Sequence, residues 1–573
     1  MTSLVRGFSI VAIALTALAA TPRPGHACGG LFCDNTQPVN QAAERIIFAE
    51  NGDGTVTAVI EIQYQGAAEQ FSWVLPVPGV PDVDVSSVAA FDRLQQQTNP
   101  QFNLQTTFED CGGGDGAAFG NTSGADAPTR ATADSVDDQG GVVVLAAGTV
   151  GPFDFEVISL DATLDDAADV ALDWLGDNGY EVTALAPEVL GPYLEDGLNL
   201  LAFRLNKQND VGSIRPIMIT YTSELPFIPI RPTAVAANDD MGVMVFVTSG
   251  DRAIPKNYKA LELNEALIDW FNPMATYNDV VIAAADEASG QGFVTEYADS
   301  SDTLEGVVVQ DWERDSWQDL MAREFSEPIQ FLFEASDLYS SWDGFQDAVR
   351  DGVTLPEGID IDDFLGCPRC YEGQTGFELD VDAFRLALFD QVIKPMFGTE
   401  DLIQSRPYIT RLYTTLSAEE MTLDPSFDFN PDLPTVSNVR NADQFIKCDG
   451  TFEITLESGD VIFGENQGVW PMAAVADQPA ARRIMQLSTQ GMGEVVTDNS
   501  EVIAGLLSES APPGGPTGPG GTTSNPGGGD DDGDGGDGGG GLCAVQTGPG
   551  AASAWLLIAL ALLPLRRRSS RNR

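Results

Sequence analysis

Histidine and lysine are nearly missing from this sequence, and their scarcity excludes several classes of function. The only histidine is His26, so the chain alone cannot form a Ser-His-Asp triad, a Cys-His dyad or a zinc site with several histidine ligands. No Gly-x-Gly-x-x-Gly motif follows a predicted strand and no Walker loop occurs, so the usual signals of nicotinamide, flavin and nucleotide binding are lacking. We therefore expect no cofactor of these classes.

Positive charge is scarce overall. The sequence has 86 Asp and Glu residues against 29 Lys and Arg residues, which gives a formal net charge of −57. An acidic surface repels nucleic acid and anionic lipid and attracts divalent cations. We expect no nucleic-acid partner, and calcium is the one ion to consider.

The beginning of the chain has the pattern of a signal peptide over residues 1–27. Arg6 supplies the positive charge and Phe8–Ala20 is the apolar run. The alternative is an uncleaved anchor helix, but this run is too short to span a bilayer. Lipidation of Cys28 is a further alternative, although Gly25 stands where a lipobox has an aliphatic residue. Export is the prediction.

The end of the chain has the pattern of a membrane anchor over residues 542–573. A linker rich in glycine, proline and aspartate, residues 511–541, precedes it and is predicted to be disordered. Cys543 and the uncharged run Ala544–Leu565 follow, and five arginines close the chain. Because charge is costly in hydrocarbon, this pattern predicts a single membrane helix with a cytoplasmic stop. The two ends together predict an exported protein of the cell envelope or outer surface, anchored at its C-terminus.

Cysteine usage agrees with export. Of the seven cysteines, six remain when Cys543 is set aside, an even number that suggests up to three disulfides. The sequence alone does not determine which cysteines pair with one another. One pair, Cys367 and Cys370, has Cys-x-x-Cys spacing. A zinc site would need a second such pair, and a redox-active dithiol should lie at the start of a helix, so a structural disulfide is favoured over a redox function. The disulfide candidates are Cys28, Cys33, Cys111, Cys367, Cys370 and Cys448.

The rest of the sequence predicts an α+β fold of two or three domains, since 573 residues with 43% hydrophobic content exceed one ordinary core. Residues 28–300 are predicted to form a β-rich domain of mainly antiparallel, sandwich-like sheets, with a disordered insertion at 111–141. Residues 301–510 are predicted to be helix-rich with a late hairpin. Alternating or short apolar runs predict strands at Arg45–Glu50, Thr55–Gln65, Phe71–Val77, Leu198–Leu205, Ile214–Thr222, Thr233–Ala237, Val243–Thr248, Val280–Ala285, Phe293–Tyr297, Phe452–Leu456 and Val461–Phe463. Residues that favour tight turns predict hairpins at Asn51–Gly54 and at Asn238–Gly242. Helical spacing predicts helices at Ser86–Leu94, Asp165–Leu175, Trp312–Glu324, Pro328–Leu338, Trp342–Val349 and Val381–Phe397.

One proline-rich stretch, Leu423–Pro434, carries candidate calcium ligands. Its side-chain oxygens are spaced so that they could surround a cation. The calcium-loop pattern that ends in a glutamate is lacking, however, so a proline-stiffened turn is the favoured interpretation. Carboxylates are abundant enough to supply a glycosidase-like pair, and the choice of any one pair would be arbitrary. The calcium candidates are Asp424, Asp428, Asn430 and Asp432.

Two resemblances follow from specific segments. The first is carried by Ala27–Cys33, Gln37–Gln41, Glu44–Ile46, Phe71–Pro78, Leu225–Asn238, Met241–Val247 and Arg411–Asn438. These segments resemble domain-of-unknown-function family 2330 of exported bacterial proteins, and the resemblance implies no assigned activity and no catalytic residues.

The second resemblance concerns the tail. Its order of cysteine, apolar segment and arginine cluster is similar to the myxobacterial C-terminal sorting signals of the MYXO-CTERM type. This resemblance implies processing or lipidation at Cys543 by sorting machinery, and a plain C-terminal anchor is the alternative.

The function that we expect is a surface-anchored binding or structural module with an unknown extracellular ligand, rather than an enzyme. A secreted carboxylate-dependent hydrolase and a calcium-dependent adhesin are the alternatives.

Overall fold

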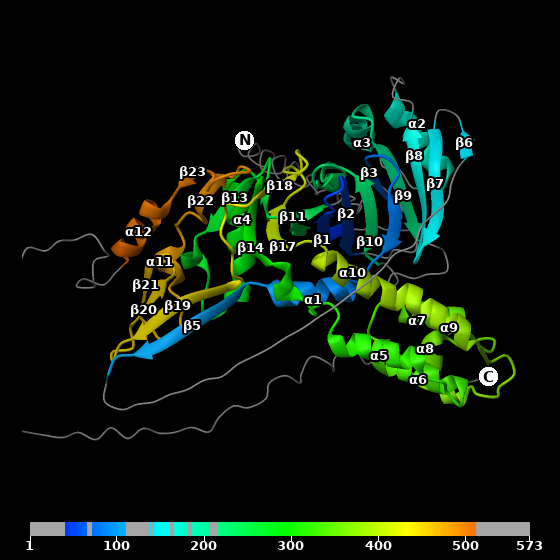
Figure 1. Ribbon diagram of the computed structural model, residues 1–573. Coiled ribbons are helices and arrows are strands. Elements are labelled where there is room, and N and C mark those ends of the chain that lie inside the picture. Colours follow the sequence, from blue (N-terminus) through cyan, green and yellow to red (C-terminus); the bar gives the residue numbers. More distant parts are fainter. Residues whose placement is uncertain are drawn as a thin grey trace, which may run out of the picture. The chain divides into compact units, whose positions relative to one another are not determined.

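The computed structural model describes residues 40–65, 72–110, 137–139, 142–160, 166–180, 186–205, 215–235 and 237–510. These residues form an α+β fold with several sheets (Figure 1). The predicted signal peptide, linker and C-terminal anchor lie outside the described residues. Within the described part, no helix is both long and apolar enough to span a membrane.

The largest sheet has ten strands and takes them from nearly the whole described chain. Neighbouring strands are antiparallel except for two parallel pairs, β1 with β11 and β13 with β14. The sequence predicts a domain boundary near residue 300, yet strands from both sides of that residue hydrogen-bond in this sheet. In order across the sheet, the strands are β23 (Glu494–Asp498), β22 (Ala481–Gln486), β13 (Lys259–Leu263), β14 (Gly292–Ser300), β17 (Tyr408–Leu416), β11 (Ala237–Ser249), β1 (Asn40–Glu50), β2 (Thr55–Gln65), β10 (Ile217–Thr222) and β4 (Asp82–Val85).

The hairpin of β1 and β2 confirms the clearest local prediction. Its turn contains Gly52 and Gly54, both with positive φ, which a residue with a Cβ adopts only with strain. Because side chains alternate along a strand, Ile46 and Phe48 enter one core while Ile47 and Ala49 enter another. The sheet is therefore covered on both faces.

A second, five-stranded sheet covers one of these faces. Trp73, Phe155 and Phe203 from this sheet share a core with Phe48 and Ile219 of the large sheet. β6 falls at the end of the segment that is predicted to be a disordered insertion, and it pairs with β7. The strands in order are β3 (Ser72–Val77), β9 (Asn199–Leu205), β8 (Phe153–Leu160), β7 (Val142–Val150) and β6 (Asp137–Gln139), and α2 (Ala167–Asp177) and α3 (Ala186–Glu195) pack against them.

Helices cover the opposite face. Buried side chains of these helices form one core with Ile47 and Phe246 of the large sheet. The predicted helix Val381–Phe397 is one continuous helical stretch, in which a π-helical segment, Phe389–Ile393, joins α9 to α10. The helices of this core are α1 (Val88–Thr98), α5 (Asp311–Ala322), α6 (Pro328–Tyr339), α7 (Phe345–Gly352), α8 (Ile361–Gly366), α9 (Val381–Leu388) and α10 (Lys394–Gln404).

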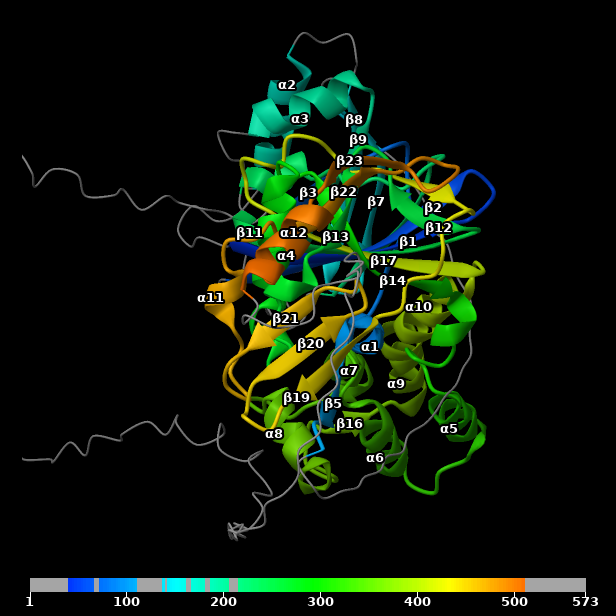
Figure 2. The same ribbon diagram turned by 90° about the vertical axis from the view of Figure 1, so that its left-hand side faces the viewer.

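A four-stranded sheet stands beside the end of the large sheet that carries β13 and β22 (Figure 2). Its late hairpin, β20 with β21, confirms the prediction, and β5 adds to β19 in parallel. Its strands are β21 (Val461–Gly464), β20 (Phe452–Leu456), β19 (Val439–Ile446) and β5 (Gln101–Phe108), and their core includes α4 (Tyr277–Glu287), α11 (Met472–Val475) and α12 (Ser500–Glu509). The remaining strands form two-stranded sheets, β12 (Arg252–Pro255) with β18 (Phe427–Asn430) and β15 (Val353–Thr354) with β16 (Glu378–Leu379).

Three predictions about strands are wrong. The predicted strand Thr233–Ala237 begins instead in a short 3-10 helix, Arg231–Val235. The predicted hairpin around residues 238–242 is instead the first part of one continuous strand, β11, which pairs with a neighbour on each side. Asp240 does take a positive φ of 54°, but the residues that tolerate it form an irregularity within the strand and not a turn. The predicted strand Val280–Ala285 lies in α4, where Val280, Val281, Ala284 and Ala285 are buried at helical spacing. A short apolar run does not distinguish a buried strand from a buried helix.

Candidate functional site

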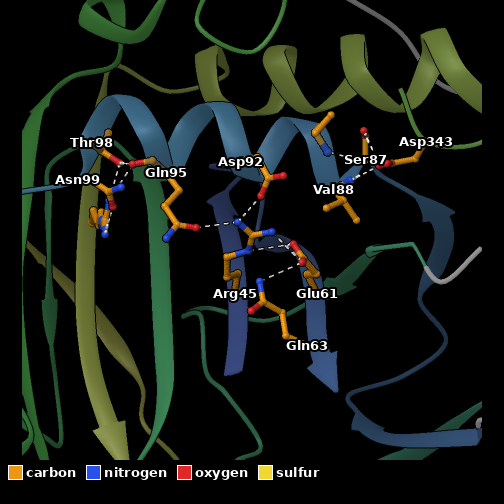
Figure 3. A network of polar contacts seen from close by, with 12 residues as sticks. Arg45, Glu61, Gln63, Ser87, Val88, Asp92, Gln95, Thr98, Asn99 and Asp343 are labelled. Carbon is orange, nitrogen blue, oxygen red and sulfur yellow. Dashed lines mark hydrogen bonds and ion pairs between the residues drawn. The ribbon is translucent and has the colours of Figure 1, made fainter. Parts of the chain in front are cut away.

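A buried polar network lies between α1 and the large sheet (Figure 3). Arg45 of β1 donates from Nε and Nη2 to both carboxylate oxygens of Glu61, at 3.0 and 2.7 Å. Its Nη1 donates to Asp92 Oδ1 at 2.8 Å and to Gln95 Oε1 at 2.7 Å, both on α1. The Arg45 and Glu61 side chains are only 6% and 10% exposed. The bidentate pair holds the guanidinium in place on the sheet, and its Nη1 therefore ties α1 to the sheet beneath it.

The first turn of α1 is held by a residue that is distant in sequence. Asp343 accepts hydrogen bonds from Ser87 Oγ at 2.7 Å and from the backbone N–H of Val88. A carboxylate at this position satisfies free N–H groups and complements the positive end of the helix dipole. The helix is thus fixed at its start by Asp343 and further along by the bonds of Asp92 and Gln95 to Arg45.

At the other end of α1 the network reaches a second buried ion pair. Arg411 of β17 donates to Thr98 Oγ1 and Asn99 Oδ1, each at 3.0 Å. Its Nε lies 2.6 Å from Glu296 Oε2, and both side chains are at most 3% exposed. Glu296 also accepts a hydrogen bond of 2.6 Å from the hydroxyl of Tyr277. Tyr277 lines a cavity, so the network extends from α1 to that cavity.

This cavity is the candidate site. It has a volume of about 460 Å³ and lies among β13, β14 and β22 of the large sheet, β19 and the β20–β21 turn of the four-stranded sheet, and the loops at 433–436 and 487–492. Three arginines line it together with three glutamates: Arg252, Arg440, Arg482, Glu262, Glu265 and Glu457. Ligand sites typically have volumes of about 300–1,000 Å³ with a few convergent polar groups, and the cavity meets both criteria.

Two of the three arginines are paired with carboxylates of the chain. Arg440 Nε is 3.7 Å from Glu265 Oε1. Arg482 Nε is 3.4 Å from Glu262 Oε1, and its Nη1 forms an ion pair with Asp460. Burial raises the pKa of Glu265, and the charge of Arg440 opposes that rise.

Arg252 differs from both. Its Nη1 donates to the carbonyl oxygen of Pro434 at 2.7 Å. Among the described residues, no carboxylate oxygen forms an ion pair with it, and its buried Nε has no hydrogen-bond partner. Burial lowers the pKa of Arg252, which is the expected effect of partial desolvation on a cation. In a chain this acidic, such an arginine has capacity for an anion that none of the described residues supplies.

The calcium candidates do not converge on one point. Asp424 accepts hydrogen bonds from the Tyr193 hydroxyl at 2.8 Å and from the backbone N–H of Ile230 at 3.0 Å. Asp428 lies 3.4 Å from Lys256 Nζ. Both carboxylates are therefore engaged by donors of the chain.

The other two candidates hold a loop. Asn430 donates from Nδ2 to the carbonyl oxygen of Gly491 at 2.8 Å, and Asp432 accepts from the N–H of Gly491 at 2.7 Å. The same loop carries Met492, which lines the cavity. In the described part of the chain, no group of three or more His, Cys, Asp or Glu residues is arranged to hold a metal ion.

The described cysteines are disulfide-bonded. Cys367 and Cys370 are joined to each other, with their Cα atoms 5.4 Å apart, and they follow the short helix α8. Cys448 is also disulfide-bonded. The other candidates, Cys28, Cys33 and Cys111, and the predicted processing site Cys543 lie outside the described residues, as does the partner of Cys448.

Sequence reasoning did not single out the cavity residues. The three arginines come from different strands: β12, β19 and β22. No motif links them, because strand pairing over long sequence separations brings them together. The one signal in the sequence that could have pointed to these arginines is composition, because basic residues are rare in this chain and each is therefore a candidate for a specific role.

Comparisons with curated proteins and with solved structures give no match. A family model described as "Uncharacterized protein conserved in bacteria (DUF2330)" matches residues 22–309. Within this range lie β1, β2, β11, β13 and β14, and the cavity residues from β19 to β22 lie beyond it. The match spans half of the chain, and the chain therefore belongs to this bacterial family of uncharacterized proteins.

Proposed function

We propose that this protein is exported, is anchored to the cell envelope by its C-terminus, and binds a small ligand in the arginine-lined cavity without transforming it. The observation that carries the binding proposal is the cavity itself. It combines a volume in the range of ligand sites, partly apolar walls and three guanidinium groups in a chain whose net charge is −57. The network from Arg45 to Tyr277 supports it, because it holds the sheet behind the cavity rigid.

Export and anchoring rest on the two ends of the sequence. The apolar run near the start suits a signal peptide, and Cys543, the uncharged segment and the arginine cluster suit a sorting signal that is read by envelope machinery. In the same proposal the N-terminal half is sandwich-like, which the core shared by β1, β2, β3 and β9 supports. Protease treatment of intact cells tests the location: an exported body is degraded while the cells remain whole, and a protected body argues against the proposal.

A blocked cavity tests the binding function. Full-length protein in detergent micelles is screened for changes in melting temperature with small organic acids, amines, sugars and short peptides. A ligand at about a hundred times its Kd stabilises the folded state by about 2.7 kcal/mol. We expect Met492→Trp, at an exposed position that lines the cavity, to abolish the effect of any such ligand.

The matched control is Val496→Trp, an exposed apolar position that does not line the cavity. This variant should keep the response of the natural protein. If no compound in the screen raises the melting temperature, or if the rise persists in Met492→Trp, ligand binding in this cavity is ruled out.

A carboxylate-dependent hydrolase is the second candidate, and one observation favours it. Glu265 lines the cavity with a pKa that burial raises, and a raised pKa suits a general acid. Activity of the full-length protein on polysaccharides or peptides that is lost in Glu265→Gln, with the melting temperature unchanged, would support this function over simple binding.

A further inference from the structure

We infer, as an extension of the proposed binding function, that the cavity takes a monocarboxylate with an apolar body, and that Arg252 binds the carboxylate group. The inference concerns the chemical class of the ligand and the residue that recognises it. It rests on the contacts of Arg252, on the charges that line the cavity and on the apolar side chains beside them.

Arg252 has unused donors. A guanidinium carries five N–H donors in a planar fork, and the hydrogen bond from Nη1 to Pro434 uses one of them. Its half-buried side chain lines the cavity, and its Nε is without a hydrogen-bond partner in the described part of the chain. Carboxylates match this fork through two parallel hydrogen bonds, which are stronger in a partly desolvated site than in water.

The charge around the cavity favours a single negative charge on the ligand. Arg440 and Arg482 already have carboxylate partners, so among the described residues that line the cavity Arg252 alone offers a guanidinium without one. Glu457, which accepts a hydrogen bond of 2.8 Å from Asn441, adds a further negative charge to the lining. A phosphate dianion would meet more repulsion here than a monocarboxylate does.

The remaining walls suit an apolar body. The large sheet and the two loops contribute branched and thioether side chains, and the four-stranded sheet contributes Phe102, around a volume of about 460 Å³. A ligand that buries apolar surface here gains about 25 cal/mol per Å² removed from water. The branched and thioether side chains that line the cavity include Leu261, Val294, Leu433, Val436, Met485 and Leu487.

Isothermal titration calorimetry with matched probes tests the inference on the full-length protein in detergent micelles. The probes are phenylacetate, its neutral analogue phenylacetamide, and phenyl phosphate. We expect phenylacetate to bind roughly tenfold to a hundredfold more tightly than the amide, the range typical of hydrogen bonds to a charged group. Phenyl phosphate should bind more weakly than phenylacetate.

Substitutions assign the preference to one residue. Arg252→Gln should remove the advantage of the acid over the amide and leave amide binding unchanged. Arg252→Lys keeps the charge but not the planar fork, so it should keep part of the preference for the acid over the amide. The control Arg204→Gln, at a partly exposed arginine of β9, should keep the whole preference. Circular dichroism shows that each variant is folded.

The outcomes separate the two proposals. Equal binding of acid and amide, or an unchanged preference in Arg252→Gln, would overturn the carboxylate inference and leave the cavity as a binding site. If none of the three probes binds to the natural protein, the inference fails, and the screen with Met492→Trp then decides whether the cavity binds anything else.

Discussion

Replacing Glu44 with glutamine should remove a loss of stability that the protein suffers as the pH rises through the neutral range. Glu44 lies on β1 and is 5% exposed, and its side-chain hydrogen bond comes from Gln41 Nε2 at 3.3 Å. It lines a cavity of about 30 Å³ between the two larger sheets, among apolar side chains that include Trp73 and Phe48. Burial raises the pKa of Glu44 from 4.5 to about 7.

The magnitude follows from linkage. Between pH 4.5 and about 7 the unfolded chain has lost the proton of Glu44 while the folded protein still holds it, so the free energy of unfolding falls as the pH rises. Each unit of pKa shift corresponds to about 1.4 kcal/mol, so a shift of this size costs about 3 kcal/mol once the pH exceeds the folded pKa. Below the unfolded pKa both states are protonated and the cost disappears.

The assay is urea unfolding of the full-length protein in detergent between pH 5 and pH 8, above the isoelectric point of about 4.1. The many surface carboxylates also respond to pH, so the informative quantity is the difference between the natural protein and Glu44→Gln. Part of this cost is already present at pH 5, so we expect that difference to grow by about 2.5 kcal/mol in favour of Glu44→Gln from pH 5 to pH 8. The control Glu195→Gln, at an exposed position of α3, should follow the natural protein. Parallel profiles for the natural protein and Glu44→Gln would refute the reasoning.

Three further predictions concern the buried network, the disulfides and calcium. Arg411→Met should lower the free energy of unfolding by about 3–5 kcal/mol, because it leaves the carboxylate of Glu296 buried without its cation, and a loss below about 1 kcal/mol in urea unfolding would contradict this. Peptide mapping without reduction should find Cys448 linked to Cys111, because parallel pairing places the end of β5 beside the residues that precede Cys448, and any other partner would contradict that register. Removing calcium with EGTA should leave the melting temperature unchanged, since the four candidate ligands are engaged by the chain, and a clear drop would support the adhesin hypothesis.

Elements with strong local signals were predictable. The hairpin of β1 and β2 combines strict alternation with glycines where positive φ is needed, and the helices α5, α6 and α9 bury side chains at regular spacing. Residues 238–242 have the same turn chemistry as that hairpin but continue as β11, because β1 and β17 occupy both of its edges. Local conformational preference does not determine which strands will pair with a given segment.

The sequence by itself determined the chemical limits of this protein: one histidine, a large excess of acids, six cysteines in the body and two apolar ends. These depend on which residues are present and on their neighbours along the chain. Only the tertiary structure decided that Arg252, Arg440 and Arg482 line one cavity and that Arg45 and Arg411 hold α1 on the sheet. Those contacts join strands and helices that are far apart in the sequence, so they depend on the order of strands in the sheets, which no local pattern encodes.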